Sequence, residues 1–422
     1  MKAKLPLIAC FTLLAACAAY ATGSQPVAVY TFACNGSAFQ FSGPCPDGGR
    51  PDTLIQGSDG NFYGAAQDSM EGSSTPTGGT VFSLTPGGTF TLLHTFTPGT
   101  NKNYPSGNLP GLLTQGPDGK LYGYTLFGGI GGCDGYCGSG VLYRVNTDGS
   151  GFRVIHKFCS ATNCADGSGG ILVVGTDGNI YGASYQGGTS ASCAPYYQGC
   201  GTIFRVTPAT GAYKVVFSFD FATTGAFPSN LTLAADGTFY GLDAGTAGEN
   251  LFHYTPATGT VQNVALNFPR FNSLPSAPAS GLIFGPNGNI YGLYHIYATN
   301  GLGVFEVQPD GSHLQLFPFY TTIDGGGSPD GLMLASDGNF WMANFNGSTG
   351  YGDIITLSPS NGTLIQTLTS FSSSTAVGAY PAGLIQVKDG TLWGSTYQGG
   401  KASRGHFADG TVFSLNAGLP PR

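Results

Sequence analysis

The phrase DGNFYG at residues 59–64 is the stretch of sequence that decides the fold. An Asp-Gly or Asn-Gly pair forms a tight hairpin turn, because Gly, Asn and Asp tolerate the positive backbone φ that such turns need. The phrase returns along the whole chain with small changes. Its seven copies are DGNFYG at 59–64, DGKLYG at 118–123, DGNIYG at 177–182, DGTFYG at 236–241, NGNIYG at 287–292, DGNFWM at 337–342 and DGTLWG at 389–394.

The copies recur at a nearly constant spacing. Their aromatic residues are separated by 59, 59, 59, 51, 50 and 52 residues, and a leucine stands five residues before each turn Asp or Asn. Regular repetition at such a period indicates one repeat architecture rather than several unrelated domains. The aromatic residues are Tyr63, Tyr122, Tyr181, Tyr240, Tyr291, Trp341 and Trp393, and the leucines are Leu54, Leu113, Leu172, Leu231, Leu282, Leu332 and Leu384.

Each repeat unit contains four short runs with the composition of strands. The run before the turn, such as GLLTQG at 111–116, and the run after it, such as NIYGA at 179–183, form a hairpin. A Gly-rich loop leads to a third run, such as VLYRV at 141–145, and a second tight turn leads to a fourth, such as RVIHKF at 153–158. Seven four-stranded antiparallel units predict an all-β fold, a seven-bladed β-propeller with the aligned leucines and aromatics packed between blades.

The two ends of the chain complement each other. The seventh unit ends after its third strand, at VFSLNAGLPPR (412–422), and an extra strand, VAVYTF at 27–32, precedes the first unit. We expect the N-terminal strand to complete the last blade and to close the ring, so that residues 22–422 form a single domain. The repeated turn is then scaffold, since a calcium loop needs several acidic ligands in a short stretch and each copy offers at most one.

Residues 1–21 have the pattern of a signal segment. Two lysines precede a short apolar run at 5–19, which is too short and wrongly flanked for a membrane-spanning helix. Two processing sites remain open: a peptidase site A-Y-A ending at Ala21, and a lipoprotein box L-A-A-C ending at Cys17, which lipidation would make the first residue. Either one predicts an extracytoplasmic protein, secreted or lipid-anchored in the bacterial cell envelope, with membrane contact only through Cys17.

The cysteines support export. Eight of the ten lie beyond the signal segment in four close pairs, and an even number behind an export signal predicts disulfides. A zinc site would need four converging ligands with tighter spacing. The predicted pairs are Cys34 with Cys45, Cys133 with Cys137, Cys159 with Cys164, and Cys193 with Cys200.

The charges point away from several functions. Only 9% of residues are charged, the formal net charge is −7, and no basic patch is present, so we expect no nucleic-acid partner. Of the 19 aspartates, 14 precede a glycine and are expected to form turns. His94 and His156 occupy matching places in fourth strands, where we expect structural roles. We recognise no catalytic or cofactor motif, and we expect no cofactor, no metal and a monomeric chain.

The loops differ between the two ends of the predicted blades. The second-to-third and fourth-to-first connections are long and lie at the same end, which we call the long-loop face. Loops on a rigid scaffold are where binding usually occurs. We predict a ligand site there from uncharged polar and aromatic residues, with Asp52 and Asp330 near the channel mouth. The candidate ligand residues are Tyr136, Tyr196, Tyr197, Tyr294, His295, Tyr297, His406, Asp52 and Asp330.

The repeat units resemble the GloVer tandem repeat of bacterial choice-of-anchor extracellular proteins. The copies that resemble it most are DGNFYGAAQ…GGTVFSL (59–84) and DGTLWGSTYQGG…DGTVFSL (389–415), whereas the units at 236–254 and 337–357 lack the GTVF part. The resemblance implies an exported or surface-anchored protein and assigns no catalytic residue. Such proteins often carry a C-terminal anchor, and none is visible in residues 418–422 of this sequence, so we expect Cys17 to be the anchor.

These features predict a binding or interaction module for an unknown glycan, peptide or protein partner on the long-loop face. The alternative is a secreted propeller enzyme of the lactonase, lyase or glycosidase kind, in which Asp52, Asp330, His295 or His406 would act at the channel mouth. An enzyme should bring ionisable groups together near the axis. A binding module should present an uncharged aromatic shelf.

Overall fold

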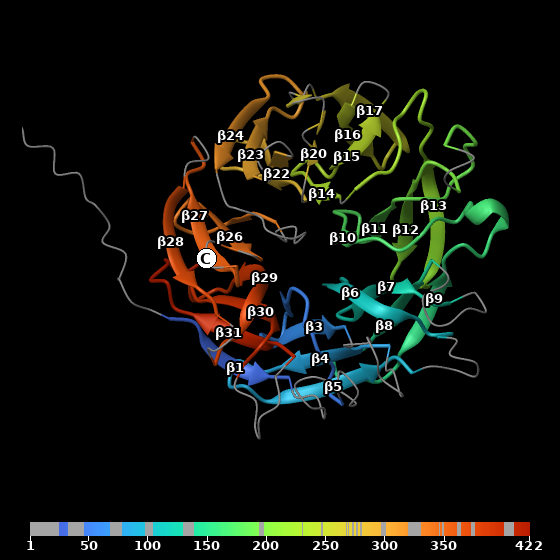
Figure 1. Ribbon diagram of the computed structural model, residues 1–422. Coiled ribbons are helices and arrows are strands. Elements are labelled where there is room, and N and C mark those ends of the chain that lie inside the picture. The colour runs from blue at the N-terminus through green and yellow to red at the C-terminus, as the bar shows by residue number, and fades with distance from the viewer. Residues whose placement is uncertain are drawn as a thin grey trace, which may run out of the picture.

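A computed structural model gives the fold of this chain. Its strands form seven antiparallel sheets arranged as blades in a ring (Figure 1), which confirms the seven-bladed β-propeller. The structure describes residues 25–32, 46–67, 78–97, 104–129, 139–193, 198–229, 231–245, 248–266, 268, 270–271, 274–275, 277–278, 281–296, 301–319, 331–345, 347, 350–360, 364–372, 376–400 and 409–422.

The chain passes through the blades in order, and the first strand of each blade lies nearest the central axis (Figure 1). Blade 1 is β2 (Ile55–Gln56), β3 (Phe62–Ala66), β4 (Thr80–Leu84) and β5 (Phe90–Thr95). Blade 2 is β6 (Asn108–Gln115), β7 (Leu121–Phe127), β8 (Val141–Val145) and β9 (Arg153–Lys157). Blade 3 is β10 (Leu172–Val174), β11 (Ile180–Ser184), β12 (Thr202–Thr207) and β13 (Ala212–Ser218). A 3₁₀ turn, η2 (Thr162–Cys164), follows β9.

The remaining blades keep this order, with additions around blade 5. Blade 4 is β14 (Thr232–Leu233), β15 (Phe239–Gly245), β16 (Gly248–Thr255) and β17 (Thr260–Ala265), and blade 5 is β21 (Ile283–Phe284), β22 (Ile290–Ile296), β23 (Gly301–Val307) and β24 (Gln315–Phe319). Between them β18 (Arg270–Phe271) pairs with β19 (Leu274–Pro275), and β20 (Ala277–Pro278) adds to β22. Blade 6 is β25 (Met333–Leu334), β26 (Phe340–Asn344), β27 (Asp353–Leu357) and β28 (Leu364–Ser370).

The two chain ends close the ring as expected. Blade 7 is formed by β29 (Ala379–Gln386), β30 (Leu392–Gln398), β31 (Thr411–Leu415) and β1 (Val27–Thr31), and β1 pairs antiparallel with β31. The C-terminal residues then cross to the preceding seam. The Arg422 N–H donates to the Lys388 carbonyl at 3.0 Å, and the Ser336 hydroxyl donates to the Pro420 carbonyl at 2.5 Å. Blades 6 and 7 are thereby joined by the last residues of the chain.

The repeated turn is scaffold, and its aspartate forms the turn through its carboxylate rather than through a positive φ. In the first copy only Gly60 has positive φ (+83°), and its N–H donates to the Gly57 carbonyl at 2.9 Å. The Asp59 carboxylate accepts hydrogen bonds from the Asn61 N–H inside the turn, at 3.1 Å, and from the Tyr63 hydroxyl at 2.7 Å. Asp177 accepts the same two bonds, from Asn179 and from Tyr181. The carboxylate therefore fastens the turn to the core aromatic of the following strand.

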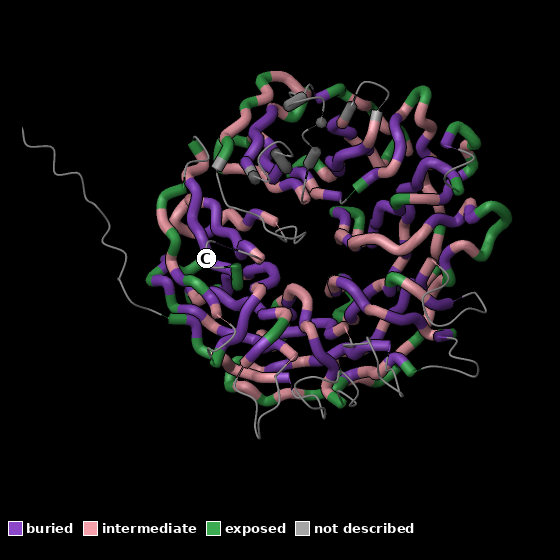
Figure 2. Tube along the Cα trace, viewed as in Figure 1, coloured by how far each residue is buried: buried purple, intermediate pink, exposed green. Residues whose placement is uncertain are grey.

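The core lies between neighbouring blades. Buried residues occupy the blade strands, whereas exposed ones concentrate at turns and on the outer strands (Figure 2). The aligned leucines are at most 9% exposed and the aligned aromatics at most 7%, which confirms their predicted place in the core. Tyr63 of blade 1, for example, belongs to a cluster with Leu121 and Tyr143 of blade 2.

The two matched histidines pack in the outer seams between blades. The His94 ring stacks on Phe152 of the next blade with centroids 3.5 Å apart, and His156 stacks on Tyr213 at 3.8 Å. Tyr30 takes the same place in the closing strand. Burial lowers the pKa of His94 to about 4, so this ring is neutral and acts as a packing group.

Candidate functional site

The long-loop face is held by disulfides at blade 3. Cys159 and Cys164 are bonded in the connection between β9 and β10, and Cys193 and Cys200 in the connection between β11 and β12. These two predicted pairs are confirmed. The other two pairs, Cys34 with Cys45 and Cys133 with Cys137, lie outside the described residues, as does Cys17. Blade 4 departs from the expected loop pattern, because β15 ends at Gly245 and β16 begins at Gly248.

The structure locates only part of the predicted ligand set. Tyr294 lies in β22, is 2% exposed and packs 6.0 Å from Phe268, so its ring belongs to the core between blades. His295 follows it in β22, where its backbone pairs with Leu302. A ligand contact by either residue stays a prediction. The residues outside the described part of the chain are Tyr136, Tyr196, Tyr197, Tyr297, His406 and Asp330.

Asp52 lies at the entry to the first blade. Its carboxylate accepts a hydrogen bond from the Thr53 N–H at 2.7 Å, and its own N–H donates to the Ala65 carbonyl at 2.9 Å. Burial, and after it the charge of Asp52, raise the pKa of Tyr124 in blade 2 to about 12. Asp52 therefore lies close to Tyr124 of the neighbouring blade, and a ligand contact by its carboxylate stays a prediction.

A strained backbone position recurs where the chain enters a blade on this face. Four residues that each precede a proline have left-handed φ values between 55° and 59°. Such values are uncommon outside glycine and require support from the surroundings. In each case the residue's N–H donates, at 2.7 or 2.8 Å, to a loop carbonyl of the preceding blade. The four pairs are Arg50 to Asp409, Leu109 to Gly78, Phe227 to Cys200, and Tyr380 to Tyr351.

The proline that follows completes this contact between blades. It lies against the glycine that precedes the third strand of the preceding blade, where a Cβ atom would overlap the proline ring. These glycines have φ values from +97° to +104°, which side chains rarely adopt. We call the left-handed residue, its hydrogen bond and the proline–glycine contact a seam clasp. The proline–glycine pairs are Pro51 with Gly410, Pro110 with Gly79, Pro228 with Gly201, and Pro381 with Gly352.

Two adjacent clasps place aromatic side chains side by side. The Tyr380 ring lies 5.0 Å from Phe345, which lies 5.8 Å from Tyr397, and the Arg50 guanidinium lies 5.1 Å from the Tyr397 centroid. Tyr351, which is 38% exposed, lies 6.1 Å from Tyr380. These five residues come from blades 6, 7 and 1 and form a continuous group on the long-loop face. We call this group the aromatic shelf.

The clasp between blades 3 and 4 forms a smaller aromatic pair. Phe227 stacks on Tyr185 with centroids 4.9 Å apart and an interplanar angle of 25°. Tyr185 is 51% exposed. Sequence reasoning missed both this pair and the aromatic shelf. A proline three residues before an aligned leucine could have identified these positions. The residue that precedes this proline is the left-handed residue of the clasp.

The Arg50 side chain has few polar partners. Its Nε is buried without a hydrogen-bond partner among the residues that the structure describes. Within the described ranges the ion pairs are Lys120 with Asp118 and His156 with Asp166, so Arg50 has none there. Its guanidinium lies over the face of the Tyr397 ring, in a cation–π contact that stabilises the positive charge.

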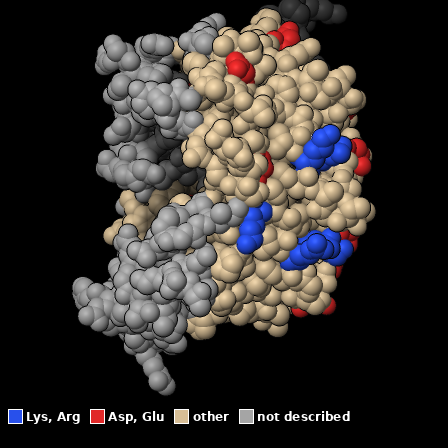
Figure 3. All heavy atoms as spheres, turned by 90° about the vertical axis from the view of Figure 1, so that its right-hand side faces the viewer, with Lys and Arg blue, Asp and Glu red and all other residues tan. Residues whose placement is uncertain are grey.

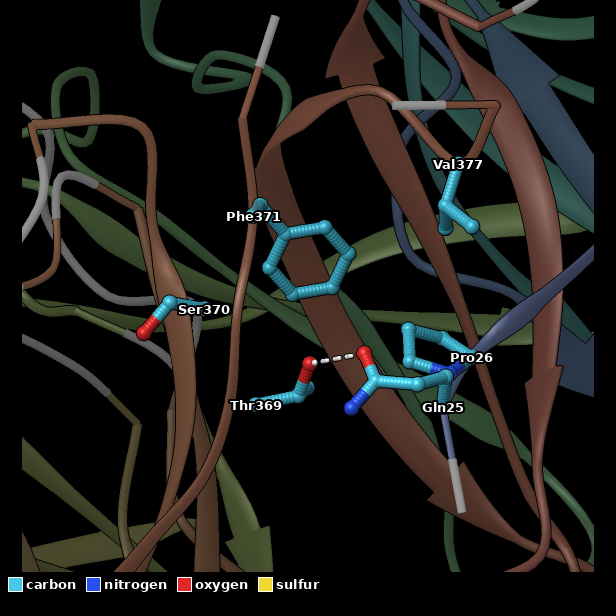
Figure 4. A pocket seen from close by; sticks show the side chains of 6 residues that line it. All are labelled: Gln25, Pro26, Thr369, Ser370, Phe371 and Val377. Atoms are coloured by element: carbon cyan, nitrogen blue, oxygen red, sulfur yellow. Dashed lines mark hydrogen bonds between the residues drawn. The ribbon is translucent and has the colours of Figure 1, made fainter. Parts of the chain in front are cut away.

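A separate pocket of about 170 Å³ lies where the ring closes (Figure 4). The Thr369 hydroxyl donates to Gln25 Oε1 across it at 3.2 Å. Its volume is below the roughly 300–1,000 Å³ of ordinary ligand pockets, so we assign no ligand to it. The lining residues are Gln25, Pro26, Thr369, Ser370, Phe371 and Val377.

One side of the described surface shows little charge. On the rim formed by β9 and β13, charged side chains are few and scattered among uncharged ones (Figure 3). Among the described residues no group of three His, Cys, Asp or Glu side chains could hold a metal ion. No described helix is long and apolar enough to cross a membrane.

The fold and the shelf define a seven-bladed β-propeller with an aromatic group on its long-loop face. The sequence model of the Gloeobacter/Verrucomicrobia repeat matches residues 18–250, more than half of the chain. This chain therefore belongs to the Gloeobacter/Verrucomicrobia repeat family, which confirms the resemblance of its repeat units.

One solved structure shares the fold, and a second resembles this chain less closely. One is the extracellular domain of a protein named as a hybrid two component system from B. thetaiotaomicron, with 13% identity, a TM-score of 0.53 and coverage of 95% of this chain and 44% of that one. Another is named as a 6-phosphogluconolactonase from Bacteroides uniformis, with 16% identity, a TM-score of 0.47 and coverage of 79% and 89%. At these identities the likeness concerns the fold alone. The comparison with curated proteins gave no match.

Proposed function

We propose that this protein is an exported binding module that holds a glycan on its aromatic shelf. The observation that supports this is the continuous contact of Phe345, Tyr380 and Tyr397 on the long-loop face. Aromatic rings offer flat apolar faces to the C–H faces of sugar rings, and tyrosine hydroxyls pair with sugar hydroxyls. A protein or peptide partner is the competing occupant, and the binding test below separates it from a glycan.

The seam clasp supports the proposal through preorganisation. The backbone of Tyr380 is fixed by its hydrogen bond to the Tyr351 carbonyl and by the contact of Pro381 with Gly352. A ring held in place before the ligand arrives loses little conformational freedom on binding. The shelf is therefore suited to recognition by stacking.

Export is part of the proposal. Two disulfides in neighbouring loops support an oxidising, extracytoplasmic compartment. We propose lipid attachment at Cys17. Cys17→Ser should move the protein from the membrane fraction to the soluble fraction. A wild-type protein that is already in the soluble fraction would favour cleavage after Ala21.

The binding test uses the propeller domain, residues 22–422, with a panel of bacterial and plant polysaccharides and with product release followed in the same wells. We expect retention without product. Tyr380→Ala and Tyr397→Ala should each weaken retention about tenfold or more, as for aromatic anchors in binding sites. Tyr185→Ala, in the smaller pair, is the matched control and should bind normally.

Three outcomes would contradict the proposal. Absence of retention on every polysaccharide would leave a protein partner as the occupant. Retention that survives in both shelf variants would place the glycan elsewhere. Product release that survives in the shelf variants would favour the enzyme alternative at the channel mouth.

A further inference from the structure

Arg50 is the charged member of the aromatic shelf. An arginine guanidinium has five N–H donors and stays protonated at any physiological pH. Here one donor, Nε, is buried with no partner in the described part of the chain, while the guanidinium lies over Tyr397. A buried donor of a charged group is normally hydrogen-bonded. The missing partner is therefore an observation that needs an explanation.

Nearby carboxylates do not supply that partner. Asp47 accepts a hydrogen bond from the Tyr30 hydroxyl at 2.7 Å, and Asp52 accepts one from the Thr53 N–H at 2.7 Å. Asp409 meets Arg50 through its backbone carbonyl, which accepts the Arg50 N–H at 2.7 Å. Across the residues that the structure describes, none of these carboxylates forms an ion pair with Arg50.

The clasp itself does not need a charge. Leu109, Phe227 and Tyr380 occupy the equivalent left-handed position in other seams, with the same backbone hydrogen bond. An uncharged side chain is thus sufficient for the fold at this position. The clasp therefore uses the backbone of Arg50 and gives its positive charge no structural role.

We propose that Arg50 binds the carboxylate of a uronic acid residue, so that the ligand of the shelf is an acidic polysaccharide. This inference rests on the proposed glycan-binding function. A guanidinium matches a carboxylate through two parallel N–H donors. The carboxylate of a uronic acid is attached to the sugar ring, so the ring can stack on Tyr380 while the carboxylate reaches Arg50 at the edge of the shelf.

The test compares polyuronates with their uncharged counterparts. Polygalacturonate, alginate and glucuronan are each offered to the exported chain beside the same polymer after carboxyl reduction, and a sulfated galactan is included. We expect at least one polyuronate to bind about 10- to 100-fold more tightly than its reduced form, the range for a hydrogen bond to a charged group. Arg50→Leu should abolish this preference.

The variants keep the test independent of folding. Arg50→Leu installs the residue that position 109 has in an equivalent clasp, and its unfolding temperature is measured beside its binding. Arg50→Lys keeps the charge without the planar pair of donors and should retain only part of the preference. Phe227→Leu is the matched change in the clasp outside the shelf and should leave the preference intact.

The outcomes separate the inference from the proposed function. Equal binding of acidic and reduced polymers, or a preference that survives in Arg50→Leu, overturns the role of Arg50 and leaves the glycan module standing. Arg50-dependent binding of the sulfated polymer alone would show that Arg50 does not recognise a carboxylate. No binding of any polymer overturns both proposals.

Discussion

The seam between blades 7 and 1 and the seam between blades 3 and 4 have the same backbone and different side chains. In the first, Arg50 donates its N–H to Asp409 and its guanidinium covers Tyr397. In the second, Phe227 donates to Cys200 and its ring stacks on Tyr185. The glycine and proline of the clasp fix the geometry, and the left-handed residue is free to differ.

In a repeated fold, specificity arises from single side chains. The repeat places one side chain at the same position in several seams, and the identity of that residue determines the chemistry of each seam. Only at blades 6, 7 and 1 do two adjacent clasps in the described part of the chain join into a continuous shelf. The predictions below test, in turn, the shared backbone, the different loop anchors and the interchangeable side chains.

The largest effect is expected from the clasp glycines. Gly201→Ala and Gly410→Ala should each lower the free energy of unfolding by about 4 kcal/mol, through backbone strain of ~1–3 kcal/mol and overpacking of ~1–3 kcal/mol. The two losses should be similar, because φ is +104° at Gly201 and +103° at Gly410 and each glycine faces a proline. Urea unfolding measures both.

A turn glycine provides the control for the clasp. Gly178 has φ of +76° with no atom within 4 Å of its Cβ position. Gly178→Ala should therefore lower the free energy of unfolding by only about 1–2 kcal/mol, the backbone contribution. If the clasp variants lose no more than this control, the proline–glycine contact does not hold the seams together.

The loops that lead into the two seams are anchored by different chemistry. At Gly225, before Phe227, the chain packs on the Asp243 carboxylate, which accepts hydrogen bonds from Asn250 at 2.7 Å and Asn263 at 2.9 Å. At Gly48, before Arg50, it packs on the Thr80 hydroxyl. Burial raises the pKa of Asp243 to about 7, despite the two amide donors. Only the seam between blades 3 and 4 therefore has an anchor that titrates near neutrality.

This anchor makes stability depend on pH. Because the folded pKa of Asp243 exceeds its unfolded value, its contribution is complete below about pH 4 and is lost as pH rises through 7. The wild type should lose about 3 kcal/mol between pH 5 and pH 8 from this group. Urea unfolding of Asp243→Asn should show most of this pH dependence removed. The remaining part is due to Glu249, whose pKa is also raised by burial. An equal dependence in both proteins would be evidence against Asp243 as the anchor that titrates.

The smallest effect is expected from exchanging the two side chains. The double variant Arg50→Phe with Phe227→Arg should change the free energy of unfolding by less than about 1 kcal/mol, since surface changes outside special features have small effects. Urea unfolding of the double variant gives the value directly. A much larger loss would show that the clasps are not equivalent.

Most of the fold was predictable because its signals are local and repeated. The leucine five residues before the turn and the aromatic four residues after the turn Asp or Asn fix the register of the first two strands in every blade. The unmatched strand at 27–32 and the missing fourth strand at the C-terminus predicted the closure that β1 and β31 make. The aspartate of the turn was partly misjudged, because its bond to Tyr63 was not considered.

The candidate site was less predictable because its geometry is created by contacts between blades. The local mark of Arg50 and of Tyr380 is the proline that follows each of them, but the support for their left-handed backbone comes from Asp409 and Tyr351, more than twenty residues away in the chain. Tyr294 shows the converse problem. It is close in sequence to a long loop, yet it lies on a strand and faces the core.

Hydrogen exchange of the propeller domain, with and without a bound oligosaccharide, locates the binding surface. If the aromatic shelf holds the glycan, new protection should appear in peptides that contain Tyr351, Tyr380 and Tyr397, and none in peptides that contain Tyr185 and Phe227. Protection at the Tyr185–Phe227 pair alone, or at the hairpin turns on the opposite face, would contradict the claim that the aromatic shelf is the binding site.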